Sequence, residues 1–275
     1  MSQIAAIQMA SGPKVDANLI EAGRLIGEAV SKGAEMVVLP ENFAIMGMTE
    51  HDKVKVREKL GEGRIQNFLR EQAAKHGIWL VGGTIPLEAS VPDKVRASCL
   101  VFNDKGERVA RYDKIHLFDV NLVENNETYH ESQTIENGEQ IAAVVDTPFG
   151  KLGLAICYDL RFPEMFRYMA REGAEIFTLP SAFTDITGKA HWEVLVRARA
   201  IENLAYVVAS AQGGYHANGR QTYGNSMIVD PWGRVLDRLP KGSGVVMADV
   251  DVQQVKSVRT TFPALQHRRV FCDLP

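Results

Sequence analysis

The sequence predicts an α/β fold, a four-layer αββα sandwich with two pseudo-repeated halves. Short runs rich in β-branched residues alternate with helical patterns along the whole chain, which is typical of layered α/β folds. Part of the first half also recurs in the second half. No linker rich in Pro, Ser or Gly divides the 275 residues, so we expect a single domain over residues 1–275.

The elements follow from local patterns. Apolar runs bounded by Gly and Pro predict strands at Ile4–Met9, Met36–Leu39, Trp79–Thr84, Ser98–Phe102, Ile141–Asp146, Leu152–Ile156, Ile176–Leu179, Ala205–Ala209, Ser226–Val229 and Val245–Val250. Helical spacing of apolar residues predicts helices at Asn18–Ser31, Ile65–His76, Pro163–Arg171 and His191–Asn203. Pro163 near the start of the third helix and Gly173 just past its end are typical of helix termini.

Two segments support an internal repeat. Gly33–Pro40 resembles Gly173–Pro180 at an offset of 140 residues, and Ser98–Val101 resembles Ser226–Val229, each followed by a turn glycine. Chance similarity between short helix-to-strand turns is the alternative explanation. If the repeat is structural, each half forms one sheet with helices on one face. The two uncovered faces then pack together.

Composition excludes several classes of protein. The chain has 31 Lys and Arg against 34 Asp and Glu, a formal charge of −3, so nucleic acid is a poor partner. Its apolar runs are far shorter than the roughly 18 residues that span a bilayer, and its N-terminus has no signal-peptide pattern. Three cysteines, Cys99, Cys157 and Cys272, are too few for a disulfide framework. We therefore expect a cytoplasmic protein.

Familiar metal and nucleotide motifs are missing. The sequence has no CxxC, no HExxH, no Walker loop and no GxGxxG after a strand. We expect no metal and no cofactor. Side-chain catalysis or simple binding remains.

A polar segment, Asn121–Gln140, has little periodicity and carries five glutamates. We expect a long loop there. Loops of this length in compact domains are usually functional or mobile.

Cys157 closes an apolar strand and precedes a charged run that includes Asp159, Arg161 and Glu164. A cysteine at such a position is most often core packing. Ligand sites of α/β folds, however, collect at the carboxyl ends of strands. A thiol there, near a helix N-terminus, is a candidate nucleophile.

Glu41 directly follows the strand Met36–Leu39 and Pro40, and its counterpart in the second half is Ser181. The turn itself therefore does not require an acid. A glutamate at a strand end is usually solvated. The functional interpretation is a partly buried carboxylate that acts as a general base.

Lys114 follows the first predicted hairpin and is flanked by apolar and aromatic residues. Most lysines are exposed, but this context favours one that turns inward and stabilises an oxyanion. His116 offers an alternative, a Cys157–His116 pair as in many thiol hydrolases. The residues alone leave both open.

Together, these motifs resemble the nitrilase superfamily of carbon–nitrogen hydrolases. The pattern comprises a glutamate after a strand, a lysine before His-Leu-Phe-Asp, and Cys-Tyr-Asp-x-Arg-Phe-Pro-Glu. Here these are Glu41, Lys114 and Cys157–Glu164. The similarity continues through Pro180–Phe183, Thr187–Gly188, His191–Glu193, Arg197–Glu202, Tyr223–Ser226, Val229–Gly233 and Gln266–Arg269.

The resemblance implies an αββα sandwich that assembles into dimers and works without a cofactor. It implies that Glu41 is the base, Lys114 the oxyanion partner and Cys157 the nucleophile. A further family glutamate matches Glu131 better than Glu124 or Glu127.

The same loop departs from the family pattern, because Asn137-Gly138 stands where Pro-Gly is common. The resemblance also adds Thr187 to the substrate pocket. The branch most similar to this sequence acts on deaminated glutathione, and the ω-amidases of 2-oxo acid amides are its near sibling.

We therefore expect an amidase that hydrolyses a small carboxylate-bearing amide through a thioester. The Tyr158 backbone N–H would share the oxyanion with the lysine. The planar fork of Arg161 suits a substrate carboxylate, or else forms a structural salt bridge with Asp159 or Glu164. The alternatives are an ω-amidase that releases ammonia and a catalytically silent scaffold.

Overall fold

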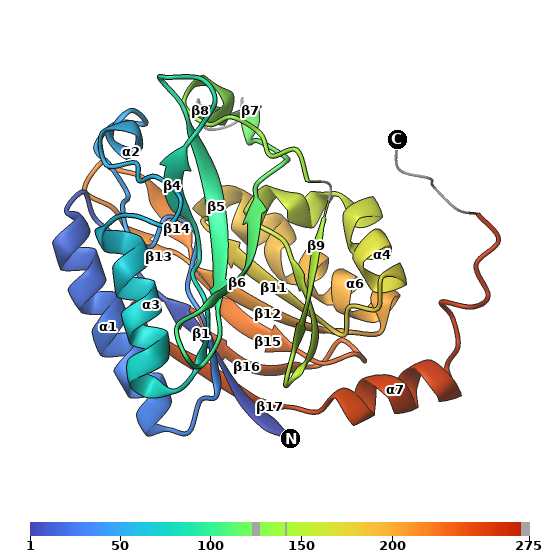
Figure 1. Ribbon diagram of the computed structural model, residues 1–275. Coiled ribbons are helices and arrows are strands. Elements are labelled where there is room, and N and C mark those ends of the chain that lie inside the picture. The colour runs from blue at the N-terminus through green and yellow to red at the C-terminus, as the bar shows by residue number, and fades with distance from the viewer. Residues whose placement is uncertain (123–126, 141, 271–275) are drawn as a thin grey trace.

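The computed structural model describes residues 1–122, 127–140 and 142–270, so Glu124, Ile141 and Cys272 lie outside it. Two sheets stack face to face and helices cover their outer faces (Figure 1). The predicted αββα sandwich is confirmed. Within the described ranges, no helix is long and apolar enough to cross a membrane.

The first sheet has the strand order β17-β1-β2-β3-β5-β4, with β6 paired to β5. Helices α1 (Val15–Ser31) and α3 (Arg64–His76) cover its outer face (Figure 1). Its strands are β1 (Ser2–Gln8), β2 (Met36–Val38), β3 (Trp79–Val81), β4 (Ile85–Glu88), β5 (Val95–Phe102), β6 (Arg108–Asp113) and β17 (Gly244–Val250).

The second sheet has the order β16-β15-β12-β11-β10-β9. Helices α4 (Pro163–Arg171) and α6 (Glu193–Asn203) cover it. Its strands are β9 (Ala143–Thr147), β10 (Gly150–Leu154), β11 (Ile176–Ser181), β12 (Tyr206–Ala211), β15 (Ser226–Val229) and β16 (Val235–Leu239). Smaller elements are α2 (Asp52–Lys55), α5 (Asp185–Thr187), α7 (Val252–Thr261), and the hairpins β7 (Asp119–Leu122) with β8 (Glu127–His130) and β13 (Gly213–Tyr215) with β14 (Gln221–Tyr223).

The repeat is visible in the backbone. Gly33 and Gly173 end α1 and α4 with φ of 96° and 95°, a left-handed conformation that favours glycine. Two residues later, the Glu35 N–H donates to the Gln3 carbonyl oxygen in β1 at 2.8 Å. The Glu175 N–H donates in the same way to the Lys151 carbonyl oxygen in β10 at 2.9 Å. In each half the next strand, β2 or β11, pairs in parallel with that first strand. The two halves therefore share one local construction.

The core explains why the strands lack a polar face. In β1, Ile4 and Ala6 pack between the two sheets, whereas Ala5 and Ile7 pack against the helices. Alternate residues of a strand point to opposite faces, and both faces of this sheet are covered. Continuous apolar runs follow from that double burial.

The structure corrects the prediction of a long loop at Asn121–Gln140. Part of that segment belongs to the β7–β8 hairpin, and Glu131–Gln133 forms a short 3-10 turn. A two-stranded ribbon outside the main sheets buries no continuous apolar face, so it leaves little periodicity in the sequence. The predicted strand Trp79–Thr84 also ends early, at Val81, and Gly83 beyond it has a left-handed φ of 57°.

Candidate active site

Three of the predicted side chains converge beyond the carboxyl ends of strands. Glu41 follows β2, Lys114 follows β6, and Cys157 follows β10 at the start of a 3-10 turn, Cys157–Arg161. Because β1–β2 and β10–β11 are parallel pairs, their carboxyl ends form a natural site. Glu131 reaches the same place from the turn after β8.

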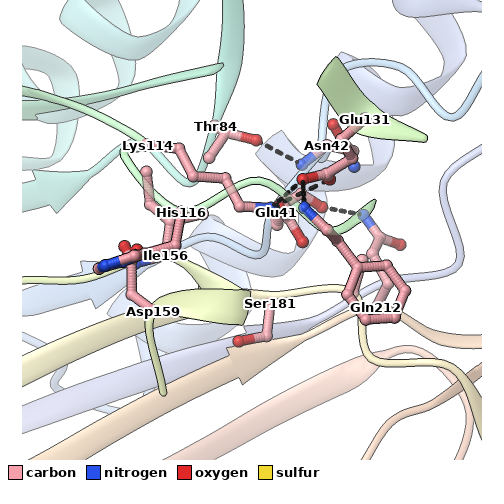
Figure 2. Close-up of polar contacts among 12 residues, drawn as sticks. Glu41, Asn42, Thr84, Lys114, His116, Glu131, Ile156, Asp159, Ser181 and Gln212 are labelled. Carbon is pink, nitrogen blue, oxygen red and sulfur yellow. Dashed lines mark hydrogen bonds and ion pairs between the residues drawn. The ribbon is translucent and has the colours of Figure 1, made fainter. Parts of the chain in front are cut away.

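Lys114 is the centre of the polar network. Its side chain is fully buried, and its Nζ donates to Glu41 Oε1 at 2.9 Å and to Glu131 Oε2 and Oε1 at 2.8 and 3.0 Å. Figure 2 shows the lysine pointing between the two carboxylates. Burial lowers the pKa of Lys114, but Glu131 and Glu41 together raise it well above its ordinary value. A buried ammonium is stable when it is paired in this way.

The backbone around Lys114 is fixed by the loop that departs from the family pattern. Gly138 donates its N–H to the carbonyl oxygen of Lys114 at 2.9 Å. A Cβ at Gly138 would lie 2.2 Å from the Asp113 carbonyl oxygen. Glycine is therefore required by close approach of the two backbones. Asn137, its neighbour, accepts a short hydrogen bond from Arg96 through its carbonyl oxygen.

Glu41 is held by its backbone. Gln212 Nε2 donates to the Glu41 carbonyl oxygen at 3.0 Å, and the next residue, Asn42, donates its N–H to Thr84 Oγ1 at 2.8 Å (Figure 2). Asn42 has a left-handed φ of 56°. The close approach of Gly83 to Pro40, where a Cβ would lie 2.2 Å from the carbonyl oxygen, completes the turn.

Glu131 accepts a second set of hydrogen bonds beyond those of Lys114. Its Oε2 accepts the Phe118 backbone N–H at 2.8 Å. Burial raises the pKa of Glu131, but Lys114, Lys53 and these hydrogen bonds lower it below its ordinary value. Both carboxylates that contact Lys114 thus belong to one hydrogen-bonded cluster.

Cys157 occupies a strained turn. Its φ is 46°, a left-handed conformation that costs a non-glycine residue about 1–3 kcal/mol. Burial and the Glu41 charge raise the pKa of its thiol well above the ordinary value, against the opposing effects of Lys114 and a backbone hydrogen bond from Ala182. The resting residue is therefore a neutral thiol beside a carboxylate.

Asp159 stabilises that turn. Its fully buried carboxylate accepts the Ile156 N–H and the Tyr112 hydroxyl at 2.8 Å each, and pairs with His116 Nδ1 at 2.6 Å. This side chain therefore ties residues 112–116 to residues 156–159. The sequence pattern offered Asp159 only as a partner for Arg161.

His116 is engaged elsewhere than at the thiol. Besides its contact with Asp159, its ring stacks on Phe162 with centroids 3.7 Å apart and an angle of 5°. Within the described residues, no hydrogen bond joins His116 to Cys157. The geometry favours the Glu41–Lys114 arrangement over a Cys–His pair.

A small cavity opens over the thiol. We call it the Cys157 cavity, and it is lined by Glu41, Phe118, Glu131, Cys157, Tyr158, Arg161, Ala182, Phe183, Thr184, Thr187 and Arg220. Every predicted site residue except Lys114, which lies beneath the two glutamates, contributes to its wall. Arg220 belongs to no motif of the sequence, and Phe183 appeared only within the Pro180–Phe183 match, with no role assigned to it.

Arg161 lies over two aromatic rings of this cavity. Its guanidinium carbon is 5.3 Å from the Phe183 ring centre and 5.7 Å from that of Tyr158, and Nη1 is 3.2 Å from His191 Nδ1. No carboxylate in the described ranges forms an ion pair with it. The alternative of a salt bridge with Asp159 or Glu164 is absent from this part of the chain. Thr187 is fixed by a 2.8 Å hydrogen bond between its hydroxyl and that of Thr184.

Among residues 1–122, 127–140 and 142–270, no group of three or more His, Cys, Asp or Glu side chains is placed to hold a metal ion.

Comparison with known proteins identifies the family. Residues 3–260 match the family model described as carbon-nitrogen hydrolase. The chain is 43% identical over 266 residues to a deaminated glutathione amidase of Synechocystis sp., covering 96% of this chain and 97% of that protein.

Solved structures agree. The NitFhit protein of C. elegans is 39% identical with a TM-score of 0.88, and the match covers 98% of this chain and 65% of that longer protein. A mutant of the amidase from Nesterenkonia sp. AN1, 25% identical over 96% of this chain and 98% of that chain with a TM-score of 0.78, shows acrylamide added at its active site cysteine. With its buried Lys114 network and this likeness over nearly its full length, the chain belongs to the carbon-nitrogen hydrolase family and is an amidase.

Proposed function

We propose that this amidase uses Cys157 as nucleophile and hydrolyses a small, carboxylate-bearing 2-oxo acid amide such as deaminated glutathione. The observation that supports this most strongly is the Lys114 ammonium held between Glu41 and Glu131 beside the neutral thiol. The name of the Synechocystis relative supports the substrate.

The first half of the reaction forms a thioester. Glu41 takes the thiol proton, and Cys157 Sγ attacks the carbonyl carbon. Lys114 and the Tyr158 backbone N–H stabilise the oxyanion, a contribution of roughly 3 kcal/mol per donor. Glu41 then passes its proton to the amide nitrogen, the C–N bond breaks and the amine leaves.

The second half releases the acid. Glu41 removes a proton from water, which attacks the thioester carbon, and the C–S bond breaks. The sulfur regains its proton from Glu41, and the product acid gives its remaining proton to solvent and leaves as a carboxylate. Glu131 contacts Lys114 through both carboxylate oxygens, so we assign it the role of orienting the ammonium and balancing its charge.

Substrate binding uses the other wall of the Cys157 cavity. The Arg161 guanidinium has no carboxylate partner in the described ranges and lies on the cavity wall. Its planar fork binds a carboxylate through two parallel hydrogen bonds. Thr187 provides a hydroxyl beside it. We assign the substrate's acyl-side carboxylate to this pair.

Intact-mass trapping of an acyl-enzyme, followed by mapping of the modified residue, tests the proposal. Substrate should add one acyl group at Cys157, and Cys157→Ala should lose both the adduct and turnover. Glu41→Gln should bind substrate yet lower kcat by on the order of 10³ or more. Full activity of Cys157→Ala would overturn the mechanism. A panel that compares release of ammonia with release of an amine separates an ω-amidase from the proposed activity.

We infer further that the chain works as one domain. Strand β17, from the end of the sequence, pairs with β1 across seven residues, from Ser2–Val250 to Gln8–Gly244. The first sheet therefore contains strands that precede and follow those of the second sheet in the sequence. Cys99 and Cys157 are free thiols, which fits a reducing compartment such as the cytoplasm.

We also propose a homodimer. Ile201, Trp232 and Phe262 are about half exposed, at 48%, 54% and 52%. Trp232 packs edge-on against Phe262 at 5.7 Å, and Gly233 abuts Ile201, so the three form one apolar patch. Such patches usually mark interfaces, and a second copy is the occupant implied by the family. Ile201→Glu should shift the sedimentation coefficient to that of a monomer; an unchanged oligomer would exclude this patch.

A further inference from the structure

A second and larger hollow opens beside the Cys157 cavity. It has a volume of about 450 Å³ and shares three wall residues, Phe118, Glu131 and Arg220, with the Cys157 cavity. Lys53 and Asn218 line its far part. We call it the Arg220 cavity. The two cavities therefore adjoin at Phe118, Glu131 and Arg220.

Arg220 is held at the boundary between the two cavities. Its backbone N–H donates to Asn218 Oδ1 at 3.0 Å, and Asn218 Nδ2 in turn donates to the Gly47 carbonyl oxygen at 2.8 Å. Its Nη2 donates to the Ala182 carbonyl oxygen at 2.8 Å. The guanidinium carbon lies 5.2 Å from the centre of the Tyr129 ring. The side chain is thus positioned before any ligand binds.

The hydrogen-bonding capacity of Arg220 is only partly used. Its Nε is buried and has no hydrogen-bond partner in the described part of the chain, which is uncommon because an unpaired buried donor is costly. No described carboxylate lies within ion-pair distance of the guanidinium. A missing anionic partner accounts for the absent ion pair.

Lys53, the other cation of the Arg220 cavity, differs in this respect. Its Nζ forms an ion pair with Glu50 at 2.5 Å. The Arg220 charge also acts on Glu50. Burial raises the pKa of Glu50, but Lys53 and, to a smaller extent, Arg220 lower it below its ordinary value. The direct ion pair of Glu50 nevertheless belongs to Lys53, so Arg220 is the cation with capacity for a ligand.

We propose that the Arg220 cavity is a leaving-group subsite, and that Arg220 binds a carboxylate at the far end of the amine half of the substrate. This inference rests on the proposed function, because it assumes that the acyl group is attached at Cys157. Arg161 then binds the acyl half and Arg220 the amine half, on different walls. The substrate class is an amide with one carboxylate on each side of the scissile bond.

Two matched substrates test the subsite. One is a 2-oxo acid amide of a dipeptide with a free C-terminal carboxylate, and the other carries a C-terminal carboxamide instead. The wild-type enzyme should prefer the carboxylate in kcat/KM by roughly tenfold to a hundredfold, as expected for a charge-assisted hydrogen bond. Arg220→Gln should reduce that preference to nearly one, and Arg220→Lys should keep part of it.

Lys53→Gln is the matched control. It removes a positive charge from the same cavity, but that charge already has Glu50 as its ion-pair partner. It should retain most of the wild-type preference. Equal losses on both substrates in Arg220→Gln, or an unchanged preference, would overturn the subsite. So would a Lys53→Gln variant that lost the preference as completely as Arg220→Gln.

A free 2-oxo acid amide separates this proposal from the proposed function. If the wild-type enzyme forms the Cys157 thioester from that amide but shows no preference between the dipeptide substrates, the subsite is wrong and the mechanism stands. If no amide acylates Cys157, the proposed function itself fails.

Discussion

Gln212, at the end of β12 in the second sheet, donates a 3.0 Å hydrogen bond to the carbonyl oxygen of Glu41, which follows β2 in the first sheet. The same amide donates to Ser11 Oγ and accepts the Ser11 N–H, at 2.8 and 2.9 Å. One fully buried side chain therefore links the carboxyl end of one sheet to that of the other.

Replacing this amide should loosen the site. Gln212→Leu has similar volume but leaves the Glu41 oxygen and the Ser11 N–H buried without partners, at about 1–3 kcal/mol each. We expect the free energy of unfolding, measured in urea, to fall by about 2–4 kcal/mol and kcat to fall with it. Gln253→Leu, at an exposed position in α7, should change neither. Equal stability of the two variants would contradict the link.

The strained turn at Cys157 should depend on Asp159. Asp159→Asn keeps the size of the side chain but removes its charge and replaces one acceptor by a donor, so that it no longer accepts a proton from His116 Nδ1 while it accepts from Ile156 and Tyr112. We expect a loss of about 2–4 kcal/mol in the free energy of unfolding and a fall in kcat. Asp146→Asn, whose side chain is 87% exposed, provides the matched control. A wild-type denaturation midpoint in Asp159→Asn would show that the turn is held by other contacts.

Two glycine substitutions should act in opposite directions. Gly138→Ala places a methyl group 2.2 Å from the Asp113 carbonyl oxygen, so the loop that holds Lys114 must move. We expect lower stability and reduced turnover. Gly27→Ala, inside α1 with no neighbouring atom within 4 Å, should raise the free energy of unfolding by about 0.5–1 kcal/mol. Thermal denaturation with a turnover assay measures both; a neutral Gly138→Ala would exclude the steric requirement.

Alkaline pH should destabilise the protein through its buried thiols. Burial raises the pKa of Cys99 to about 12, and the pKa of Cys157 is also raised. The unfolded thiols ionise at a lower pH than the folded ones, so the unfolded state binds fewer protons and stability falls as pH rises above about 9. Urea denaturation at about pH 8 and pH 10.5 measures the loss.

Cys99→Ala provides the control for that measurement. It should lower the free energy of unfolding at both pH values, because it leaves a small cavity. The difference in the free energy of unfolding between the two pH values should be smaller than in the wild-type protein. An undiminished difference would assign the alkaline loss to other groups, such as Lys114, whose raised pKa acts in the same direction.

The sequence by itself was sufficient to predict most of the main-sheet strands and those helix boundaries that are marked by a proline or a glycine. Pro163 and Arg171 bound α4 as predicted, because proline and glycine fix backbone torsions locally. It also predicted Glu41, Lys114 and Cys157 as one site, to which the family resemblance added Glu131, and the structure brings these four side chains together. Local elements without an apolar face escaped, notably β7, β8, β13 and β14.

Only the tertiary structure decided how these residues meet. Glu41 and Lys114 are 73 residues apart in the chain, and no local pattern encodes the 2.9 Å contact that parallel strand ends create. Packing between segments likewise decided the partners of two other residues. His116 pairs with Asp159, and Arg161 lies over two aromatic rings. Arg220 carried no signal at all. Motifs report which chemistry a chain can perform, but the distance and desolvation that give each group its partner arise only when the two sheets stack.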